Sequence, residues 1–255
     1  GGAARLVMEL KSGIDNYIDF QTSLFVKEKH SYDSSVFTVK NKNIFFTKLS
    51  KLIGKDIESI LYNKFHYFLS NDIEFFNNNA LLNSRQLEEA DIVHAHNLHN
   101  NFFNLKLLSE ISKKKPVIWS LHDMWAITPH EAWLIKDTKG KTLFEMETKP
   151  NLLWNNRKHL LDTKKNIYAK SDLHIVSTSK WFTNELKKSI LKDKQLYLIH
   201  NGIDTEIYKN YDKIESRRTL NLPENKKIIT LMAAGGKHNP QKGWSYAEEV
   251  IKNYK

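Results

Sequence analysis

Residues 90–130 read ADIVHAHNLHNNFFNLKLLSEISKKKPVIWSLHDMWAITPH, and this stretch decides the fold. Two short apolar runs, residues 91–95 and 116–121, flank a segment in which Phe103, Leu107 and Ile111 recur at helical spacing. This order predicts a strand, a helix and a second strand, joined as a parallel βαβ unit. Right-handed crossovers bring the C-terminal ends of both strands to one edge of the sheet, where open α/β sheets bind ligands.

Polar side chains follow both predicted strands. They are His94, His96, Asn97 and His99 at the first strand and the pair His122-Asp123 after the second. An imidazole at a strand end can donate a hydrogen bond to a sugar hydroxyl or to developing charge, and an adjacent carboxylate can orient it. We predict a ligand site on this rim, with His122 and Asp123 as catalytic residues and His96 and Asn97 as substrate-binding residues.

A metal site is the alternative interpretation of the histidines. His94 and His96 would share one face of a strand, which suits chelation. The neighbouring asparagines are poor zinc ligands, however, and the chain has no Cys and no HExxH motif. We therefore predict no metal, with one histidine buried and hydrogen-bonded and the others lining the rim.

Composition limits the class of protein. With 255 residues, 40% of them hydrophobic, the chain is long enough to bury a core, and no apolar run is long enough to span a bilayer. The net charge of +10 favours anionic partners, although dispersed surface lysines would give the same balance. The absence of Cys fits a reducing cytosol, so we predict a cytoplasmic protein.

Hydrophobic periodicity predicts the remaining elements. We expect strands at residues 23–26, 36–39, 173–176, 196–199 and 227–233, and helices up to Gly13, at 44–69, at 151–170, from Ser179 to Ile190 and from Trp244 onward. Ser179 is expected to be an N-cap rather than a nucleophile. Residues 125–150 show no clean period, so we predict a long loop there.

The chain changes character after Asp204. A polar stretch leads to Pro223, and the apolar run at 227–233 then enters a glycine-rich loop. We predict a Rossmann-like N-terminal domain at 1–206, and at 207–255 a linker with the first βα unit of a second Rossmann-like domain. An opening glycine pair and a single closing βα unit suggest that further strands precede and follow this chain.

The loop at 233–244, AAGGKHNPQKGW, has the chemistry of phosphate binding. Glycines let backbone N–H groups approach a phosphate, the helix N-terminus adds partial positive charge, and Lys242 adds a full charge. The loop is neither a Walker A motif nor GxGxxG, and a simple βα loop with a solvated lysine is the alternative. We predict that a nucleotide diphosphate sugar held between two domains is bound by Gly1, Gly2, Gly235, Gly236, Lys237 and Lys242.

Six segments together resemble motifs of glycosyltransferase family 4, the retaining GT-B group, and most closely its bacterial members that build surface polysaccharides. They fall in family order and cover nearly the whole chain: GGAAR (1–5), DIVHAHN (91–97), PVIWSLHDMWA (116–126), STSKW (177–181), HNGIDT (200–205) and the loop at Lys242 and Gly243. Each segment is weak alone, and the ordered set is specific.

The resemblance implies an α/β, GT-B type fold with two Rossmann-like domains that meet at His200–Thr205. It implies transfer of a sugar, with retention, from a nucleotide diphosphate sugar to a saccharide or lipid-linked saccharide acceptor. Gly2 would lie against the donor, His122 would contact its sugar, and Lys242 would hold the diphosphate without a metal or other cofactor. Lipid-linked acceptors and the positive net charge favour peripheral contact with anionic lipid at the inner face of the cell membrane.

Three features depart from the family pattern. The family's paired glutamates, seven residues apart, would lie beyond Lys255, so we expect this chain alone to be inactive. Gly236 stands where relatives often carry a second basic residue, with Lys237 beside it. Pro129 stands where close relatives often have Gly, and the Cys-rich loop that follows in them is absent, which leaves the acceptor loop's conformation open.

Two other functions were weighed against this one. A different Rossmann-type nucleotide-sugar enzyme, such as an epimerase, would share much of the pattern. A basic nucleic-acid-binding module would fit the charge, but the chain has no basic stripe interleaved with aromatic residues, and we predict no nucleic-acid partner. A GxSxG hydrolase elbow and a glycosidase carboxylate pair are both missing.

Overall fold

The computed structural model describes residues 2–17, 19–39, 52–53, 60, 64, 67–74, 79–99, 102–132, 135–136, 142–143, 153–233, 235–238 and 242–253. Two compact units follow one another along the sequence, unit 1 at Gly1–Asn201 and unit 2 at Gly202–Lys255. The boundary lies inside the segment 200–205 that was expected at a domain junction, slightly before the predicted boundary at 206.

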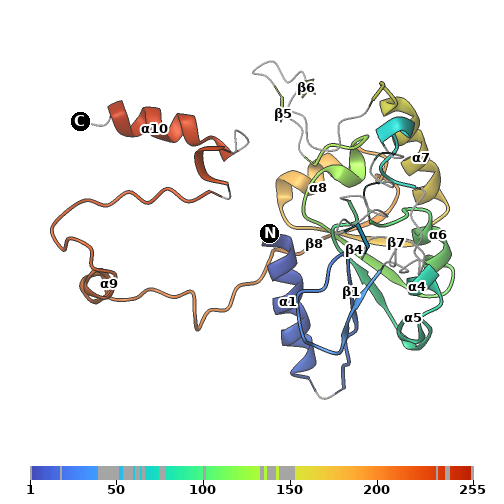
Figure 1. Cartoon of the computed structure of the whole chain (residues 1–255), viewed down its shortest axis with the longest axis horizontal. Coiled ribbons are helices and arrows are strands. Elements are labelled where there is room, and N and C mark those ends of the chain that lie inside the picture. Colours follow the sequence, from blue (N-terminus) through green and yellow to red (C-terminus); the bar gives the residue numbers. More distant parts are fainter. Residues whose placement is uncertain are drawn as a thin grey trace. The chain divides into compact units, whose positions relative to one another are not determined.

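Unit 1 is built around a four-stranded parallel sheet with the order β3-β4-β7-β8 (Figure 1). Its strands are β3 (Val93–Ala95), β4 (Val117–Leu121), β7 (Leu173–Ser177) and β8 (Gln195–Leu198). In each of the central strands β4 and β7 all residues but one are buried, as expected where both faces of a parallel sheet are covered. The predicted βαβ unit is confirmed, because β3 and β4 pair in parallel across α6 (Leu107–Ser112).

A second parallel pair of strands precedes this sheet in the sequence. Strands β1 (Leu24–Val26) and β2 (Val36–Thr38) follow helix α1 (Gly2–Asp15), at the three places where the sequence predicted these elements. Phe25 and Phe37 stack across the pair with ring centroids 5.4 Å apart. Unit 1 therefore contains a mixed α/β fold with parallel sheets, in agreement with the Rossmann-like architecture predicted for it.

The other elements are shorter or lie further along the chain. They are α4 (Asn79–Leu82), α5 (Arg85–Glu89), the 3-10 helix η1 (Trp125–Ile127), an antiparallel pair β5 (Ile135–Lys136) and β6 (Thr142–Leu143), α7 (Arg157–Ala169), α8 (Lys180–Leu186), α9 (Lys213–Thr219), the 3-10 helix η2 (Gly236–His238) and α10 (Trp244–Asn253). The predicted cap of α8 is confirmed, because the Ser179 hydroxyl accepts a hydrogen bond from the Phe182 N–H at 3.2 Å.

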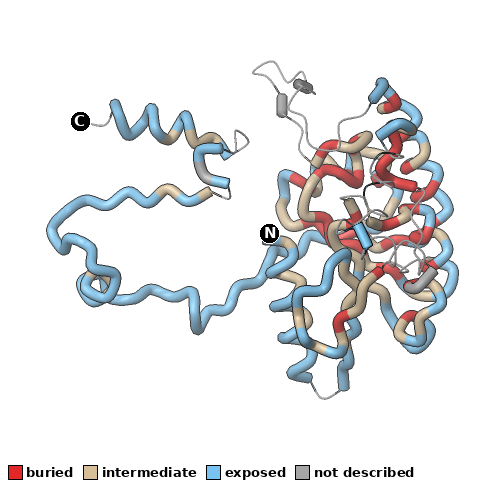
Figure 2. Tube along the Cα trace, viewed as in Figure 1, coloured by how far each residue is buried: buried red, intermediate tan, exposed pale blue. Residues whose placement is uncertain are grey.

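The hydrophobic core of unit 1 lies between the sheet and its helices (Figure 2). Helix α6 packs on β4 and α7, and α8 packs on β7 and β8. The largest fully buried aromatic side chains are Trp119 of β4 and Tyr168 of α7, which meet edge to face with centroids 5.7 Å apart. Residues of unit 2 for which burial is described are exposed or half-buried.

The helix after β3 begins later than the sequence predicted, and Phe103 lies outside it. The Asn104 side chain accepts a hydrogen bond from the Lys106 N–H at 3.1 Å, and the Leu105 N–H donates to the distant Ile73 carbonyl at 2.8 Å. Both bonds take backbone groups away from a helix, so α6 starts only at Leu107. Phe103 is nevertheless buried, because the turn before the helix packs into the same core.

Other predicted boundaries also differ from the structure. Helix α7 starts at Arg157 rather than near 151, α8 ends at Leu186 rather than Ile190, and the predicted loop at 125–150 contains η1, β5 and β6. The helix predicted at 44–69 lies largely outside the described residues.

Unit 2 differs most from the prediction. Residues 227–233 form no strand, because no other segment among the described residues of unit 2 pairs with them and a strand needs a partner. Helix α9 was not predicted, although its signals are visible: the Asp212 carboxylate caps it by accepting from the Ile214 and Glu215 N–H groups, and Arg217 and Arg218 lie in its last turn. None of the helices in the described part of the chain is both long and apolar enough to cross a membrane.

Candidate functional site

The C-terminal ends of the four parallel strands of unit 1 form one polar rim. His96 follows β3 directly, His122 and Asp123 follow β4, Thr178 follows β7, and His200 lies just beyond β8. The ends of the neighbouring strands β7 and β8 are joined, because His200 Nδ1 lies 2.9 Å from the Thr178 carbonyl oxygen. The residues predicted from separate motifs are therefore carried by neighbouring strand ends.

Three imidazoles on this rim form a histidine chain: His94, His96 and His122. His94 Nε2 lies 2.8 Å from the Ser120 hydroxyl, and the His94 and His96 rings lie 4.2 Å apart. The His96 ring stacks nearly parallel to His122, and His96 Nδ1 lies 3.1 Å from His122 Nε2. Whichever ring donates that hydrogen bond, His122 keeps Nδ1 as its ring nitrogen for a ligand.

Burial keeps the histidine chain neutral. It lowers the pKa of His96 to about 3, helped by the neighbouring His94 and His122 rings. Burial also lowers the pKa of His94 and that of His122, for which Asp123 partly opposes the effect. At neutral pH, therefore, His122 offers a neutral imidazole that can donate or accept one hydrogen bond.

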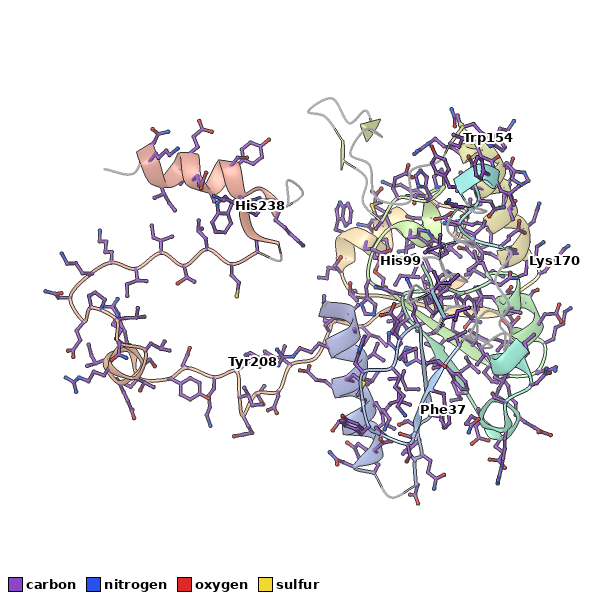
Figure 3. The ribbon with its side chains drawn as sticks, in the orientation of Figure 1. Phe37, His99, Trp154, Lys170, Tyr208 and His238 are labelled. Atoms are coloured by element: carbon purple, nitrogen blue, oxygen red, sulfur yellow. The ribbon has the colours of Figure 1, made fainter. Side chains whose placement is uncertain are left out.

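The two carboxylate oxygens of Asp123 connect the loop that follows β4 with the loop that follows β3. Its Oδ2 lies 2.7 Å from Nε2 of His99, a residue labelled in Figure 3, and its Oδ1 accepts the Trp125 N–H at 3.0 Å. Both side chains of the His99–Asp123 pair are largely buried. This geometry orients the loop, and it ties the end of β4 to the loop after β3.

A side chain of the buried core also holds the rim in place. The buried Trp119 indole donates to the His96 carbonyl oxygen at 2.8 Å, which fixes the backbone of the residue that contacts His122. The region of the chain that the structure describes contains no group of three or more His, Cys, Asp or Glu side chains arranged to hold a metal ion. The rim histidines instead contact one another, a serine and an aspartate.

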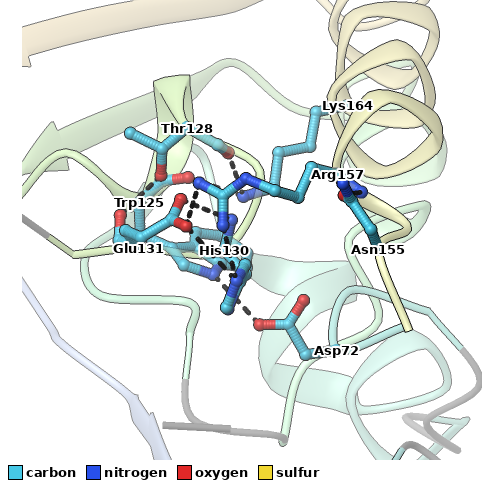
Figure 4. Close-up of polar contacts among 8 residues, drawn as sticks. All are labelled: Asp72, Trp125, Thr128, His130, Glu131, Asn155, Arg157 and Lys164. Atoms are coloured by element: carbon cyan, nitrogen blue, oxygen red, sulfur yellow. Dashed lines mark hydrogen bonds and ion pairs between the residues drawn. The ribbon is translucent and has the colours of Figure 1, made fainter. Parts of the chain in front are cut away.

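A second polar group lies behind the loop after β4. We call it the buried charged network: the buried residues Asp72, Glu131 and Lys164, together with the partly exposed Arg157 (Figure 4). Arg157 forms an ion pair with Glu131, whose Oε1 also lies 3.3 Å from His130 Nε2. Lys164 Nζ donates to the carbonyl oxygens of Trp125 at 2.6 Å and Thr128 at 3.0 Å.

The network lies in a low-dielectric environment. Burial lowers the pKa of Lys164 to about 7, although Asp72, Glu131 and Asp123 oppose this effect in that order. Burial also raises the pKa of Asp72, whose Oδ1 has no hydrogen-bond partner among the described residues. The other oxygen of Asp72 lies 3.5 Å from the Trp125 indole nitrogen.

Comparison with known protein families decides the class of protein. The model of the family described as Glycosyltransferase Family 4 matches residues 30–207, well over half of the chain. The chain belongs to glycosyltransferase family 4. No curated protein matches the chain.

Membership of glycosyltransferase family 4 favours a glycosyltransferase over an epimerase or a nucleic-acid-binding module. The matched residues include the whole rim of unit 1, from His94 to His200, and the buried charged network behind it. The glycosyltransferase prediction therefore rests on the region whose geometry is described above.

The predicted phosphate-binding residues lie outside the match to glycosyltransferase family 4. Gly1 falls outside the described residues; Gly2 begins α1, and nothing lies within 4 Å of the position that a Cβ would take there. Gly235 adopts a φ of 79°, a conformation that favours glycine, and it leads into η2 with Gly236 and Lys237. Lys242 is exposed and lies shortly before α10. The four residues Gly235, Gly236, Lys237 and Lys242 therefore belong to the segment of unit 2 that leads into α10.

The buried charged network was not predicted from the sequence. A signal was present in α7, where Lys164 lies four residues after Leu160 and four before Tyr168, in the middle of the apolar face. At such a position, the side chain of a lysine either extends its amine to solvent or places the amine in the core, where it needs hydrogen-bond partners. Asp72 carried no comparable signal, because no periodic pattern surrounds it.

Proposed function

We propose that this chain forms part of a retaining GT-B glycosyltransferase that transfers a sugar from a nucleotide diphosphate sugar to an acceptor hydroxyl. Membership of glycosyltransferase family 4 supports the general activity. The observation that carries the residue assignment is the His96–His122 contact, which leaves a neutral His122 with Nδ1 for a ligand at the strand ends.

In the proposed reaction, the bond between the anomeric carbon and the diphosphate oxygen breaks while a bond to the acceptor oxygen forms on the same face. The acceptor proton leaves with the diphosphate. His122 hydrogen-bonds to the donor sugar, and the loop of Gly235, Gly236, Lys237 and Lys242 stabilises the charge that develops on the diphosphate, with Gly2 against the donor. The donor is the substrate, and the mechanism needs no metal or other cofactor.

The roles of the remaining rim residues follow from their contacts. His96 positions His122, and Asn97 follows it on the same loop as a substrate-binding residue. Asp123 acts at the site through His99 and the Trp125 backbone, which occupy its two oxygens. We therefore assign Asp123 to holding the loop in place, and His122 to direct contact with the sugar.

The proposed acceptor and cellular setting rest on the resemblance to the family and on the net charge. We propose a saccharide or lipid-linked saccharide acceptor and a role in cell-surface polysaccharide synthesis. With a net charge of +10, peripheral binding at the cytoplasmic face of an anionic membrane would bring the enzyme to lipid-linked substrates.

The proposal is tested with the full-length protein. UDP-glucose, UDP-N-acetylglucosamine and GDP-mannose are supplied in turn, release of the nucleoside diphosphate is measured, and NMR assigns the anomeric configuration of the sugar product. We expect the wild type to keep the anomeric configuration of the donor sugar in the product. We expect His122→Ala to lower kcat by about 100-fold, because it removes a contact to the transition state. His159→Ala, at an exposed position of α7, is the matched control and should not change kcat. Inversion would contradict the retaining mechanism, and an unchanged kcat in His122→Ala would contradict the role of His122.

A further inference from the structure

One face of helix α7 binds the loop that follows the His122-Asp123 pair. Arg157, Lys164 and Tyr168 are spaced seven and four residues apart, which places them on the same side of a helix. Arg157 pairs with Glu131, Lys164 binds two loop carbonyls, and the Tyr168 hydroxyl donates to the Ala126 carbonyl at 2.9 Å. Figure 4 shows Arg157 and Lys164 reaching from the helix toward this loop.

Lys164 has the most demanding position of the three. Its side chain is fully buried, and its Nζ lies 3.6 Å from the centre of the Trp125 ring as well as against the two carbonyls. The two carbonyls belong to Trp125, the first residue of η1, and to Thr128, the residue that ends it. A single side-chain nitrogen therefore holds both ends of one 3-10 turn.

That turn is connected directly to the candidate active site. The Trp125 N–H donates to Asp123 Oδ1, and the other oxygen of Asp123 contacts His99. A shift of η1 would move the donor that holds the Asp123 carboxylate. Asp123 in turn lies close enough to Lys164 to affect its titration, so the two are also linked by charge.

An apolar residue at 164 could fill the same space but could not replace these bonds. It would leave the Trp125 and Thr128 carbonyl oxygens without their lysine donor. A buried acceptor that loses its hydrogen bond costs the desolvation free energy of that group. Buried ionic groups often add little net stability compared with a well-packed apolar side chain, so their value lies in what they position. The carboxylates of Asp72 and Glu131 oppose the cost of burying the lysine.

We propose that Lys164 is a positioning residue of the candidate active site, which fixes the η1 turn and thereby orients Asp123 toward His99. Its consequence for catalysis rests on the proposed transferase function. The geometric role stands apart from that function, because it concerns contacts that exist without substrate.

The test uses the histidine ring nitrogen signals of this chain, recorded by NMR without any sugar nucleotide. His99→Gln identifies the His99 signal by its loss, and the exposed His159 of α7 reports on general disturbance of that helix. Lys164→Met is compared with Lys158→Met, the same substitution at an exposed position of the same helix. A double variant, Lys164→Met with Asp72→Asn, removes the buried carboxylate that would otherwise be left without its cation.

We expect Lys164→Met to displace the His99 Nε2 signal and to lower the melting temperature by about 10 °C, whereas Lys158→Met changes neither. The double variant should regain part of the melting temperature while the His99 signal stays displaced, because relieving the charge does not restore the turn. If the single variant does not fold, the double variant decides.

A His99 signal at its wild-type position in the folded variants would overturn the proposal, as would a signal that returns together with stability. Either result would reduce Lys164 to a structural ion. Because no substrate is involved, these outcomes are independent of whether the transferase assay succeeds.

Discussion

The histidine chain and the buried charged network are attached to the same loop, yet they differ in the two properties that govern a polar side chain: exposure and charge. His96 and His122 are half-buried and neutral, and they are held by contacts between imidazole rings at the edge of the sheet. Glu131 and Lys164 are fully buried, and they are held by ion pairs and backbone carbonyls.

The difference separates the residues that we propose to meet a ligand from the residues that hold the loop after β4 in place. A neutral imidazole at a strand end can exchange a hydrogen bond with a substrate at little cost. A buried cation cannot leave its partners without a large desolvation penalty, so it serves to fix one arrangement. The loop after β4 thus has an adaptable side, formed by the histidines, and a fixed side, held by α7.

The largest loss of stability is expected from a substitution in the buried charged network, at Glu131. We expect Glu131→Gln to lower the free energy of unfolding by about 3–5 kcal/mol, because it removes a buried carboxylate that faces the buried Lys164 and the partly exposed Arg157. Urea unfolding followed by circular dichroism measures this loss.

The matched control for this variant is Glu89→Gln, which breaks the exposed pair between Arg85 and Glu89 on α5. Exposed pairs contribute about 0–1 kcal/mol, so this variant should stay close to the wild type. Equal losses in the two variants would contradict the distinction between a fixed and an adaptable side.

A smaller effect is expected from acid on the histidine chain. His96 has a pKa of about 3 in the folded chain against an ordinary value of 6.5, so the unfolded state binds more protons between these values. Stability is therefore full above pH 6.5 and is lost as the pH falls toward 3. We expect the wild type to lose about 2 kcal/mol more than His96→Gln between pH 6.5 and about pH 4.5, in urea unfolding at each pH. Parallel pH profiles would show that His96 is not buried as a neutral ring.

The smallest effect is expected at the cap of α8, next to the rim. Ser179→Ala should cost about 1 kcal/mol by removing the acceptor for the Phe182 N–H, and the loss should not depend on pH. Ser84→Ala, which removes the equivalent cap of α5, is the comparison and should cost a similar amount. A loss at Ser179 that grows in acid would mean that the cap is coupled to the histidines, and the rim would then be less adaptable than we infer.

The sequence predicted the adaptable side well. His96 and His122 follow short apolar runs that predict strands, and the C-terminal ends of parallel strands lie at one edge of the sheet. The Ser179 cap was also predictable, since a cap depends on the residue itself and on the next few positions. What the sequence did not provide was the pairing of ring nitrogens, which depends on the register between β3 and β4.

The fixed side depended on contacts between distant segments. Lys164 meets carbonyls near residue 125, and Asp72 meets the Trp125 indole, across separations that no local pattern encodes. The late start of α6 has the same origin, because the Leu105 N–H is taken by Ile73. In unit 2, the apolar run at 227–233 carried a strand signal but found no partner among the described residues.

Three features could thus be read from the sequence alone. They are the alternation of strands and helices in a parallel α/β fold, the location of the rim motifs at one edge of the sheet, and the resemblance to glycosyltransferase family 4. These features follow from local periodicity and from the handedness of the chain, which a sequence carries directly. Only the tertiary structure decided that His122 is a neutral ring with Nδ1 for a ligand, and that α7 holds the loop behind it. Burial and desolvation set both results, and they arise only when segments far apart in the sequence exclude water together.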